Sequence, residues 1–582
     1  MFLDELRLTR FRSCVETRVT FRPELTVLVG ENNGGKSNII DAMRLLTLPL
    51  NGRRERYAED DDVSRGSEQD TFAIEGRFSG MSDTIKGLFI SAVPDPTEDT
   101  AILGIRYQKK AHNRLRGKTS YWVGKFDTAE PEQGSSDLVR HVFLPPLRDA
   151  RQALGSGSTS HITNLLRYFL TTSEEEDQFL QEAKRANETS PRVLQDVKSE
   201  IDNALGDLTR GIREQKASLE FNTDTLWDIA RDLRFKLADA VVTPEDIRFS
   251  GLGYANLLYI ASVVVELAKA KEADLTLFLV EEPEAHLHPQ LQMLVLDFLL
   301  QHAQKSATEV SDGQPEGRIQ VIVTTHSPNL TAWISPEHLV IVRSVFVENE
   351  SSAIANTACV PIAKLGINEH AMKKINRYLD VTRSAFLFGI RVLMVEGIAE
   401  ALLLPVIAKH LIFRGDKHAW QRFRGTAIVP IDGVDFLPYI EILLKPYADT
   451  TIADHVIVIT DADPSVRGNR KGQLEEAASE WSSNAKLSVF TNEVTLEHSL
   501  YMAGNEALLK CAFLRIHPRS DDKWRESVTE SEHPAMGLVE LLQTSKTRKG
   551  DYAQQLADFI EEGLLLKVPE YLQTAIYKVI ES

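Results

Sequence analysis

Cysteine is scarce in this sequence, and that scarcity excludes two kinds of structure. Only three cysteines occur among 582 residues, Cys14, Cys359 and Cys511, far apart and without a CxxC pair. Structural zinc sites and disulfide frameworks need clustered cysteines at characteristic spacings. We therefore expect neither, and we expect a reducing compartment, the cytoplasm, to be the location of the protein.

A long apolar run is also missing. The most apolar long stretch, Leu257 to Leu267, contains Glu266 and is shorter than the roughly 20 residues that a membrane-spanning helix needs. The first residues, Met1 to Glu5, lack the basic segment and apolar core of a secretory signal. The sequence therefore predicts no membrane insertion.

An excess of positive charge is absent as well. The formal net charge is −18, which argues against a wholly basic coat for nucleic acid, although binding depends on local fields. Three local basic clusters do occur, in Arg106 to Lys118, Lys409 to Arg424 and Lys546 to Lys549, and the second has aromatic residues between its cations. Most charge runs are solvated faces, so each cluster is only a candidate contact for phosphates.

One glycine-rich stretch organises the rest of the chain. The apolar run Val27 to Val29 stops at Gly30, and the residues from Gly30 to Ser37 match G-x-x-x-x-G-K-[ST] before a helical pattern begins. Such a loop places backbone N–H groups and a helix N-terminus around nucleotide phosphates. Lys36 would reach the β- and γ-phosphates, and Ser37 would hold Mg²⁺. The candidate nucleotide-binding residues of this loop are Gly30, Asn33, Gly35, Lys36 and Ser37.

The length and the hydrophobic periodicity predict several domains of the α/β class. A composition of 43% hydrophobic and 26% charged residues is ordinary for a globular protein, and 582 residues suggest three or four domains. We predict an ABC-type ATPase head with a helical dimerisation insert, followed by a second α/β domain with a helical C-terminal part. The predicted bounds are 1–160 and 244–347 for the two lobes of the head, 161–243 for the insert, 348–385 for a linker, and 386–582 for the second domain.

Two strands that follow the glycine-rich loop in sequence end in chemically active residues. The apolar strand Leu277 to Val280 leads into Glu281 and Glu282, and the strand Ile319 to Thr325 leads into His326. The carboxyl ends of strands in an α/β sheet are where ligands bind. We predict that Glu281 helps to hold Mg²⁺, that Glu282 polarises the attacking water, and that His326 senses the γ-phosphate.

These motifs resemble those of ABC-type ATPases of the structural-maintenance-of-chromosomes class. By that resemblance, Ser250 and Gly251 form a signature loop that completes the ATP site of a second protomer. Glu281 stands where the wider class usually has Asp. The nearby His286 and His288 are not expected to bind a metal, because their place after the catalytic strand favours a loop or core role.

Acidic residues gather at predicted strand ends in the second half of the chain. Glu396 follows the strand Arg391 to Val395, and Glu400 lies four residues later on a helix. Asp461 and Asp463 follow the strand His455 to Thr460. Carboxylates brought together in this way repel one another unless a divalent cation neutralises them, and hard oxygen ligands favour Mg²⁺ or Mn²⁺.

The acidic pattern resembles the Toprim domain, the metal-dependent cleavage and joining module of topoisomerases and primases. A head followed by Toprim resembles the OLD (overcoming lysogenization defect) family of nucleases, which includes the nuclease subunit of Gabija phage-defence systems. The resemblance implies that Glu396, Glu400, Asp461, Asp463 and Glu497 are metal ligands and that Lys549 is catalytic. For Lys549, a solvated charge on a loop is an equally open reading.

The resulting hypothesis is an ATP-dependent, metal-dependent DNA endonuclease with a role in anti-phage defence. The cofactors expected are ATP and Mg²⁺ or Mn²⁺, and the partners expected are DNA and a second copy of the chain. Some relatives work beside a helicase, and the sequence leaves a helicase partner open. An alternative is a DNA-clamping repair or structural ATPase that does not cut. A topoisomerase or primase is a poorer alternative, because no nucleophilic tyrosine motif is recognisable.

Dimerisation is assigned to the insert, 161–243. Apolar residues recur there at helical spacing among many charges, and a stripe of that kind on a protrusion usually marks a partner surface. We therefore predict a homodimer or higher oligomer that forms without ATP. A hairpin that folds back on itself in a monomer is the alternative.

Overall fold

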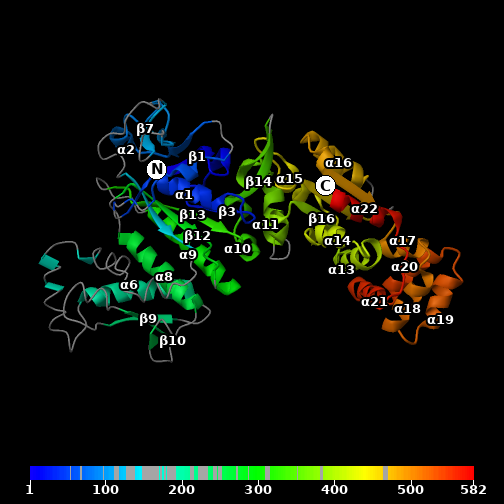
Figure 1. The fold of residues 1–582 in the computed structure, drawn as a ribbon. Helices are drawn as coiled ribbons and strands as arrows, with labels where there is room; N and C mark the ends of the chain where they lie inside the picture. The colour runs from blue at the N-terminus through cyan, green and yellow to red at the C-terminus, as the bar shows by residue number, and fades with distance from the viewer. Residues whose placement is uncertain are drawn as a thin grey trace. The chain divides into compact units, whose positions relative to one another are not determined.

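The computed structural model divides into two units, Met1–Pro361 and Ile362–Ser582, and each unit contains β-sheet structure of its own (Figure 1). Each unit is described by itself. The structure describes all residues except 51, 53, 55, 66–68, 96, 111–116, 126–137, 147–168, 171–173, 176–177, 180–191, 210–214, 221–233, 240–244, 247–251, 270–272, 286, 309–314, 350–351, 380–383, 463–468 and 582.

A seven-stranded sheet forms the centre of the first unit, in the order β15-β14-β3-β13-β12-β8-β4. Its strands are β3 (Leu25–Val29), β4 (Leu48–Pro49), β8 (Val139–Leu144), β12 (Leu275–Glu281), β13 (Arg318–Thr325), β14 (Leu339–Asn349) and β15 (Ser352–Pro361). All neighbours run parallel except β14 and β15. Every residue of β3 and β12 is buried, as expected for parallel strands covered on both faces. The strands predicted at the glycine-rich loop and before Glu281 and His326 are thus confirmed.

An antiparallel sheet lies beside it in the same unit, in the order β2-β1-β5-β6-β7. Its strands are β1 (Phe2–Phe11), β2 (Cys14–Thr20), β5 (Thr71–Ser79), β6 (Thr100–Gln108) and β7 (Lys118–Val123). Burial alternates along β5, so one face of this sheet packs on the core. The helices of the unit are α1 (Lys36–Leu46), α2 (Asp83–Leu88), α6 (Arg192–Thr209), α8 (Leu252–Lys269), α9 (Pro289–Thr308) and α10 (Pro328–Trp333).

The prediction of a wholly helical insert at 161–243 is wrong in part. Helix α6 confirms the helical spacing, but β9 (Gln215–Glu220) and β10 (Arg234–Asp239) pair in a small sheet with β11 (Glu245–Asp246). Residues in these two segments alternate between apolar and polar types, a period of two that favours strands. Helical spacing describes only the part of the insert that forms α6.

The predicted linker at 348–385 also differs from the structure. Residues 352–361 form β15, which pairs along its whole length with β14 and therefore belongs to the first unit. The remainder contains α11 (Glu369–Tyr378), which packs against α15 (Leu437–Leu444) of the second unit. The boundary between units falls at Pro361, because the hairpin adds an antiparallel edge to the central sheet.

The second unit is built on a parallel four-stranded sheet in the order β17-β16-β18-β19. Its strands are β16 (Arg391–Val395), β17 (Ala427–Pro430), β18 (His455–Thr460) and β19 (Leu487–Thr491). Its other helices are α13 (Ile398–Ile407), the π-helical turn η7 (Ala408–Ile412), α14 (Lys417–Arg424), α16 (Arg470–Glu480), α17 (Leu496–Met502), α18 (Glu506–Ile516), α19 (Asp521–Trp524), the π-helical turn η9 (Arg525–Thr529), α20 (Pro534–Thr544), α21 (Lys549–Glu561) and α22 (Glu570–Glu581). The predicted sheet followed by a helical part is confirmed.

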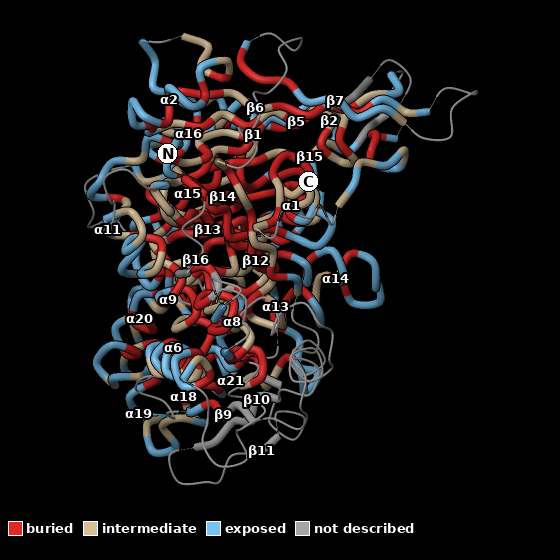
Figure 2. Tube along the Cα trace, turned by 90° about the vertical axis from the view of Figure 1, so that its left-hand side faces the viewer, coloured by how far each residue is buried: buried red, intermediate tan, exposed pale blue. Residues whose placement is uncertain are grey.

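Buried residues concentrate on the strands and on the inner faces of the helices (Figure 2). In the second unit, one apolar cluster joins β16 and β18 to α13, α18, α20, α21 and α22. It therefore fixes α13 and α21 against each other beside the sheet. Among the described helices, none is both long enough and apolar enough to cross a membrane.

Candidate active sites

The glycine-rich loop lies between β3 and α1, as the sequence predicts. A Cβ at Gly30 would meet the carbonyl oxygen of Val342 at 1.9 Å, so only glycine fits there. Gly35 has φ +105° and abuts the hydroxyl of Thr357, which a Cβ would meet at 2.2 Å. Asn33 also has a positive φ, 67°. The loop backbone is therefore held close to β14 and β15, and α1 begins directly after it.

Lys36 is folded into this loop and is only 5% exposed. Its Nζ donates to the carbonyl oxygens of Gly30 and Glu31, both at 2.8 Å. Burial lowers the pKa of Lys36 to about 8, although Glu282 and Glu284 act in the opposite direction. Because these two acceptors are neutral carbonyls, the charge of the ammonium is available to an anionic phosphate.

Glu281 ends β12 next to the first turn of α1. The hydroxyl of Ser37 donates a hydrogen bond to its carboxylate, and burial raises the pKa of Glu281, with Asp41 and Glu282 adding to the rise. A hydroxyl and a carboxylate in contact supply two hard oxygen donors at the amino end of the helix. The pair that the sequence predicts for Mg²⁺ is brought together.

Glu282 and His326 meet at the carboxyl ends of the adjacent parallel strands β12 and β13. His326 Nε2 lies 3.5 Å from Glu282 Oε1, and its Nδ1 lies 3.4 Å from Lys36 Nζ. A charged Lys36 can only donate, so Nδ1 accepts and Nε2 carries the proton that faces Glu282. Burial and the charge of Lys36 lower the pKa of His326, which keeps the ring neutral. Glu282 has φ +45°, an uncommon backbone conformation for a residue with a side chain.

Glu284 is a residue that sequence reasoning missed. Its Oε1 accepts hydrogen bonds from the Thr325 hydroxyl at 2.7 Å and from the backbone N–H of His326 at 2.9 Å. Burial raises its pKa. Glu284 thus fixes the backbone at His326. In the sequence, its place in the Glu-Glu-Pro-Glu run is the pattern that could have indicated this role.

A second site lies at the carboxyl ends of β16 and β18. Glu396 Oε1 accepts hydrogen bonds from the Thr460 hydroxyl, from the backbone N–H of Asp461 at 2.7 Å and from Arg470 at 2.8 Å. Arg470 also donates to Thr460 and to the carbonyl of Asp461. Sequence reasoning missed Arg470, because no spacing rule connects it with a strand end ten residues earlier.

Three more acids converge on this point. Glu400 is 8% exposed on the first turn of α13, and Glu497 is 4% exposed on the first turn of α17. Burial raises the pKa of Glu400 to about 7, and repulsion from Asp461 and Glu497 adds to it. Burial and then Glu396 raise the pKa of Asp461 to about 6. These carboxylates therefore hold protons that an ordinary Asp or Glu would have lost.

Asn492 is a further residue that the sequence did not reveal. Its amide donates to Asp461 Oδ1 at 2.5 Å and to the Tyr571 hydroxyl at 3.4 Å. The first bond lowers the pKa of Asp461 against the effect of burial. Asn492 follows β19, the strand next to β18, so only the strand order brings it to this place.

Lys549 begins α21, which packs against α13. Its Nζ lies 4.0 Å from Glu497 Oε2. Burial alone would lower its pKa, but Glu497, Asp461, Glu400 and Glu396 together raise it. Lys549 is exposed and lies at the first residue of a helix rather than on a loop, and its catalytic role stays a prediction.

Donor chemistry at this site fits a hard divalent cation. All four described acids supply carboxylate oxygens, and the pKa shifts of Glu400 and Asp461 record their mutual repulsion. Among the described residues, no three Asp, Glu, His or Cys side chains are arranged so that they could share one ion. Glu396, the acid that follows β16, forms an ion pair with Arg470 at 2.8 Å.

Several predicted residues lie outside the described part of the chain. These are Ser250 and Gly251 of the signature loop, Asp463 of the acidic set, and His286. Their predicted roles stay predictions. His288 is exposed, and its position just before α9 agrees with the loop role expected for it.

Two family models match the chain in the order that the motifs predict. The model described as "AAA ATPase domain" matches residues 1–86 and 109–331. The model described as "Overcoming lysogenization defect protein-like, TOPRIM domain" matches residues 387–463. These domains imply nucleotide binding and the use of a divalent metal.

Two known nucleases match part of the chain. The Old nuclease of Escherichia phage P2 is 24% identical over 441 residues, 70% of this chain and 70% of that protein. Endonuclease GajA of Bacillus cereus is 26% identical over 228 residues, 37% of this chain and 30% of that protein. Among solved structures, an Smc head bound to the C-winged helix domain of ScpA aligns with a TM-score of 0.41 and 17% identity, over 62% of this chain and 99% of that chain. The predicted resemblance to the OLD family is confirmed by the family models and these two nucleases.

Proposed function

We propose, since this chain belongs to the AAA ATPase domain family and carries an OLD-like TOPRIM domain, that it is an ATP-regulated, metal-dependent DNA endonuclease. The observation that carries the proposal is the convergence of Glu396, Glu400, Asp461 and Glu497 with Lys549 in the second unit. A clamp that binds DNA without cutting has no use for such a cluster.

In the head, the chain's own residues bind and orient ATP with Mg²⁺. The loop from Gly30 to Ser37 would cradle the phosphates, Lys36 would neutralise the β- and γ-phosphates, and Ser37 with Glu281 would hold the metal. Glu282 orients the attacking water, and His326 senses the γ-phosphate beside it. Glu284 keeps His326 in place through its backbone.

In the TOPRIM unit, Glu396, Glu400, Asp461, Asp463 and Glu497 would hold Mg²⁺ or Mn²⁺. Bound there, the metal would supply charge neutralisation and an activated water for phosphodiester hydrolysis. Lys549 stabilises negative charge that develops on the phosphate, and Asn492 keeps Asp461 oriented. Arg470 holds Glu396 between Thr460 and Asp461.

Assembly is part of the same proposal. Ser250 and Gly251 would complete the ATP site of a second copy, so that the active form is a homodimer or higher oligomer held through the insert. Light scattering without nucleotide tests it: a mass near the single-chain 65.3 kDa would refute a constitutive dimer. A helicase partner and a role in anti-phage defence complete the proposal, and both are supported by the OLD resemblance alone.

Incubation of supercoiled plasmid with the protein and Mg²⁺ or Mn²⁺ tests the nuclease function. Nicked or linear products that need the metal are expected. A ladder of relaxed topoisomers would instead indicate a topoisomerase. Binding without any cleavage would favour a DNA-clamping ATPase, the candidate that gains support from a 27% identity over 219 residues to the DNA replication and repair protein RecF of Rhizobium rhizogenes.

A further inference from the structure

We propose that a basic surface on the second unit binds the phosphate backbone of duplex DNA beside the bond that is cut. The surface, here the α14 basic surface, consists of Lys409, Arg414, Lys417, Arg422 and Arg424. The proposal rests on the proposed function for the identity of the DNA as substrate, and it adds where that substrate is held.

All five side chains of the α14 basic surface are exposed, and α14 is pale blue over much of its length in Figure 2. Elsewhere on the unit, exposed cations such as Lys510 and Arg515 pair with Asp521 and Glu562. Within the described residues, the five cations of the surface have no carboxylate within ion-pair distance. Their charge therefore faces solvent uncompensated, in a chain whose net charge is −18.

The carboxylate nearest in sequence is already engaged. Asp416 caps α14 by accepting hydrogen bonds from the backbone N–H groups of His418 and Ala419. On the other flank, His410 faces Glu561 at 4.0 Å, so the surface ends at η7 on that side. What is left is a run of exposed positive charge along η7, the following turn and α14.

Helix stability explains only part of this set of cations. Lys417 is the first residue of α14, where the positive end of the helix dipole disfavours a cation. Arg414 lies in the turn that follows η7, where its charge complements no helix end. Lys409, in the last turn of η7, and Arg422 and Arg424, in the last turn of α14, do complement the dipole. Two of the five cations thus bring no electrostatic gain to the fold.

A rigid aromatic scaffold holds the surface in place. Phe413 and Phe423 are buried, with ring centroids 6.0 Å apart, and Trp420 stacks on Phe423 at 6.0 Å. Tyr577 of α22 packs edge-on against Phe413 at 5.7 Å. These contacts fix the helical segment that carries the cations, so no backbone ordering is needed when a polyphosphate backbone binds.

The same helical segment connects the surface to the acidic site. α13 and η7 run without interruption from Ile398 to Ile412, and Glu400 lies in the first turn. At about 1.5 Å per residue, Ile412 lies about 18 Å along the helix from Glu400. Duplex DNA rises about 3.4 Å per base pair, so this separation corresponds to about five base pairs. The α14 basic surface would therefore hold phosphates about half a helical turn from the cleaved bond.

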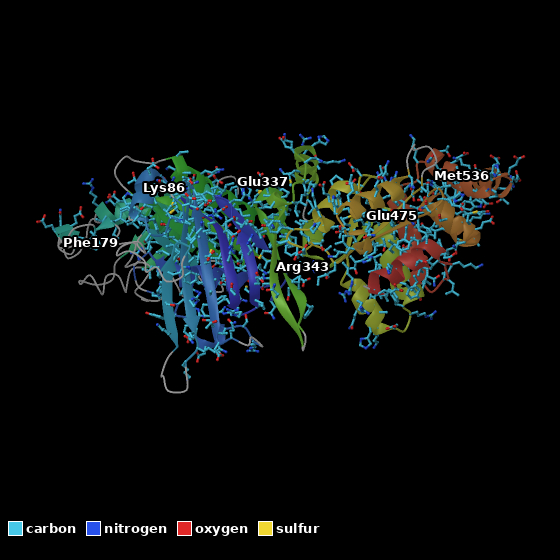
Figure 3. All side chains as sticks on the ribbon, turned by 90° about the horizontal axis from the view of Figure 1, so that it is seen from above. Lys86, Phe179, Glu337, Arg343, Glu475 and Met536 are labelled. Carbon is cyan, nitrogen blue, oxygen red and sulfur yellow. The ribbon has the colours of Figure 1, made fainter. Side chains whose placement is uncertain are left out.

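The decisive test compares two triple variants with the same change in charge. One removes surface cations, Lys409→Gln, Arg414→Gln and Lys417→Gln. The control removes ion-paired cations of the same unit, Lys510→Gln, Arg515→Gln and Arg525→Gln. Figure 3 shows how side chains cover this unit, with Glu475 on α16 and Met536 on α20 labelled. Affinity for a 30-base-pair duplex is measured by fluorescence anisotropy with EDTA, across a series of NaCl concentrations.

Each phosphate contact contributes about 0.9 to the slope of log Kd against log salt. The surface variant should lower that slope by about 2 to 3, and the control variant should keep the wild-type slope. An unchanged slope in a surface variant with wild-type thermal stability would overturn the proposal, as would an equal loss in the control. Binding of wild type to vesicles of anionic lipid that is lost in the surface variant would also overturn it, in favour of a membrane.

Cleavage separates this inference from the proposed function. On a long duplex, the surface variant should raise KM with little change in kcat, whereas a duplex too short to reach the surface should be cut equally by both proteins. If wild type binds DNA with the expected slope but never cuts, the nuclease proposal fails and the surface stands. If wild type cuts DNA and the surface variant has the same salt slope and KM, the proposal for the α14 basic surface is refuted and the nuclease proposal stands.

Discussion

In both candidate sites, burial shifts the pKa of a charged side chain, downward for a lysine in the head and upward for carboxylates in the second unit. In the head, burial lowers the pKa of a cation, Lys36, to about 8. In the second unit, burial raises the pKa of Glu400 to about 7 and that of Asp461 to about 6. A buried charge is stabilised by a counter-charge, so the head is prepared for an anion and the second unit for a cation.

The sites also differ in how they are assembled. The head builds its site from one contiguous loop, in which backbone carbonyls hold Lys36 and helix α1 begins directly after Gly35. The acidic site collects side chains from β16, α13, β18, α17 and α21, which are far apart in sequence. The comparison teaches that the first site depends on backbone conformation, whereas the second depends on the packing of several elements.

The largest effect is expected from removal of a carboxylate in the acidic site. Asp461→Ala should reduce DNA cleavage by at least about 10³-fold, because a metal ligand contributes several kcal/mol to transition-state stabilisation. ATP hydrolysis should persist, since the head does not use this residue. The same result is expected for Glu396→Ala. Cleavage at the wild-type rate by either variant in a plasmid assay would contradict the proposed metal site.

A smaller effect, confined to the head, should separate binding from chemistry. Glu282→Gln should bind ATP normally and hydrolyse it about 10²–10⁴-fold more slowly, as expected for loss of a group that activates water. Lys36→Ala should lose ATP binding itself, because it removes the buried cation of the loop. Nucleotide affinity from calorimetry and turnover from phosphate release give both quantities. Equal loss of affinity in the two variants would refute the division of roles.

The raised pKa of Glu400 predicts a dependence of stability on pH. Between the ordinary pKa of 4.5 and the raised value of about 7, the folded state holds more protons than the unfolded state, so stability falls as pH rises through this window. In metal-free protein, this fall in the free energy of unfolding is on the order of 3 kcal/mol, and Glu400→Gln should remove it. Urea denaturation at pH 4.5 and 7.5 measures the free energy of unfolding of both proteins. If the difference between variant and wild type does not depend on pH, the raised pKa of Glu400 is not its cause.

The smallest effect is expected for Asn492. Asn492→Leu removes the hydrogen bond that favours ionised Asp461, so the pKa of Asp461 should rise further and protons should compete better with the metal. About a 10-fold loss of metal affinity at pH 6.5 is expected, with recovery toward pH 8.5. Asn505→Leu is the matched control: Asn505 bonds only to backbone groups of Leu500 and Lys567, so it should lower thermal stability without changing metal affinity.

Sequence patterns could predict that the candidate residues of the head lie together, because each belongs to a local motif or to a strand end. Gly30 to Ser37 form one motif, and Glu281, Glu282 and His326 each follow an apolar strand that parallel pairing aligns with its neighbour. The acids Glu396, Glu400 and Asp461 follow the same rule. Arg470 and Asn492 escaped prediction because their positions depend on the packing of α16 and on the order of β18 and β19, which no local pattern encodes.

The two errors of fold have a similar origin. The strands β9 and β10 lie in a charged region in which helical spacing was the clearer pattern. The strand β15 belongs to a hairpin at the edge of a sheet, and its composition resembles that of a linker. In both regions, the partner strand determines the structure more than the segment does.

Proton release on metal binding tests the central claim most directly, namely that the acidic site is prepared for a divalent cation. Mn²⁺ is titrated by calorimetry at pH 6 in two buffers of different ionisation enthalpy, using wild type and Asp461→Asn. With pKa values of about 7 and 6 for Glu400 and Asp461, binding should release about one proton or slightly more per site in wild type and fewer in the variant. Binding without proton release, or the same release from both proteins, would contradict it.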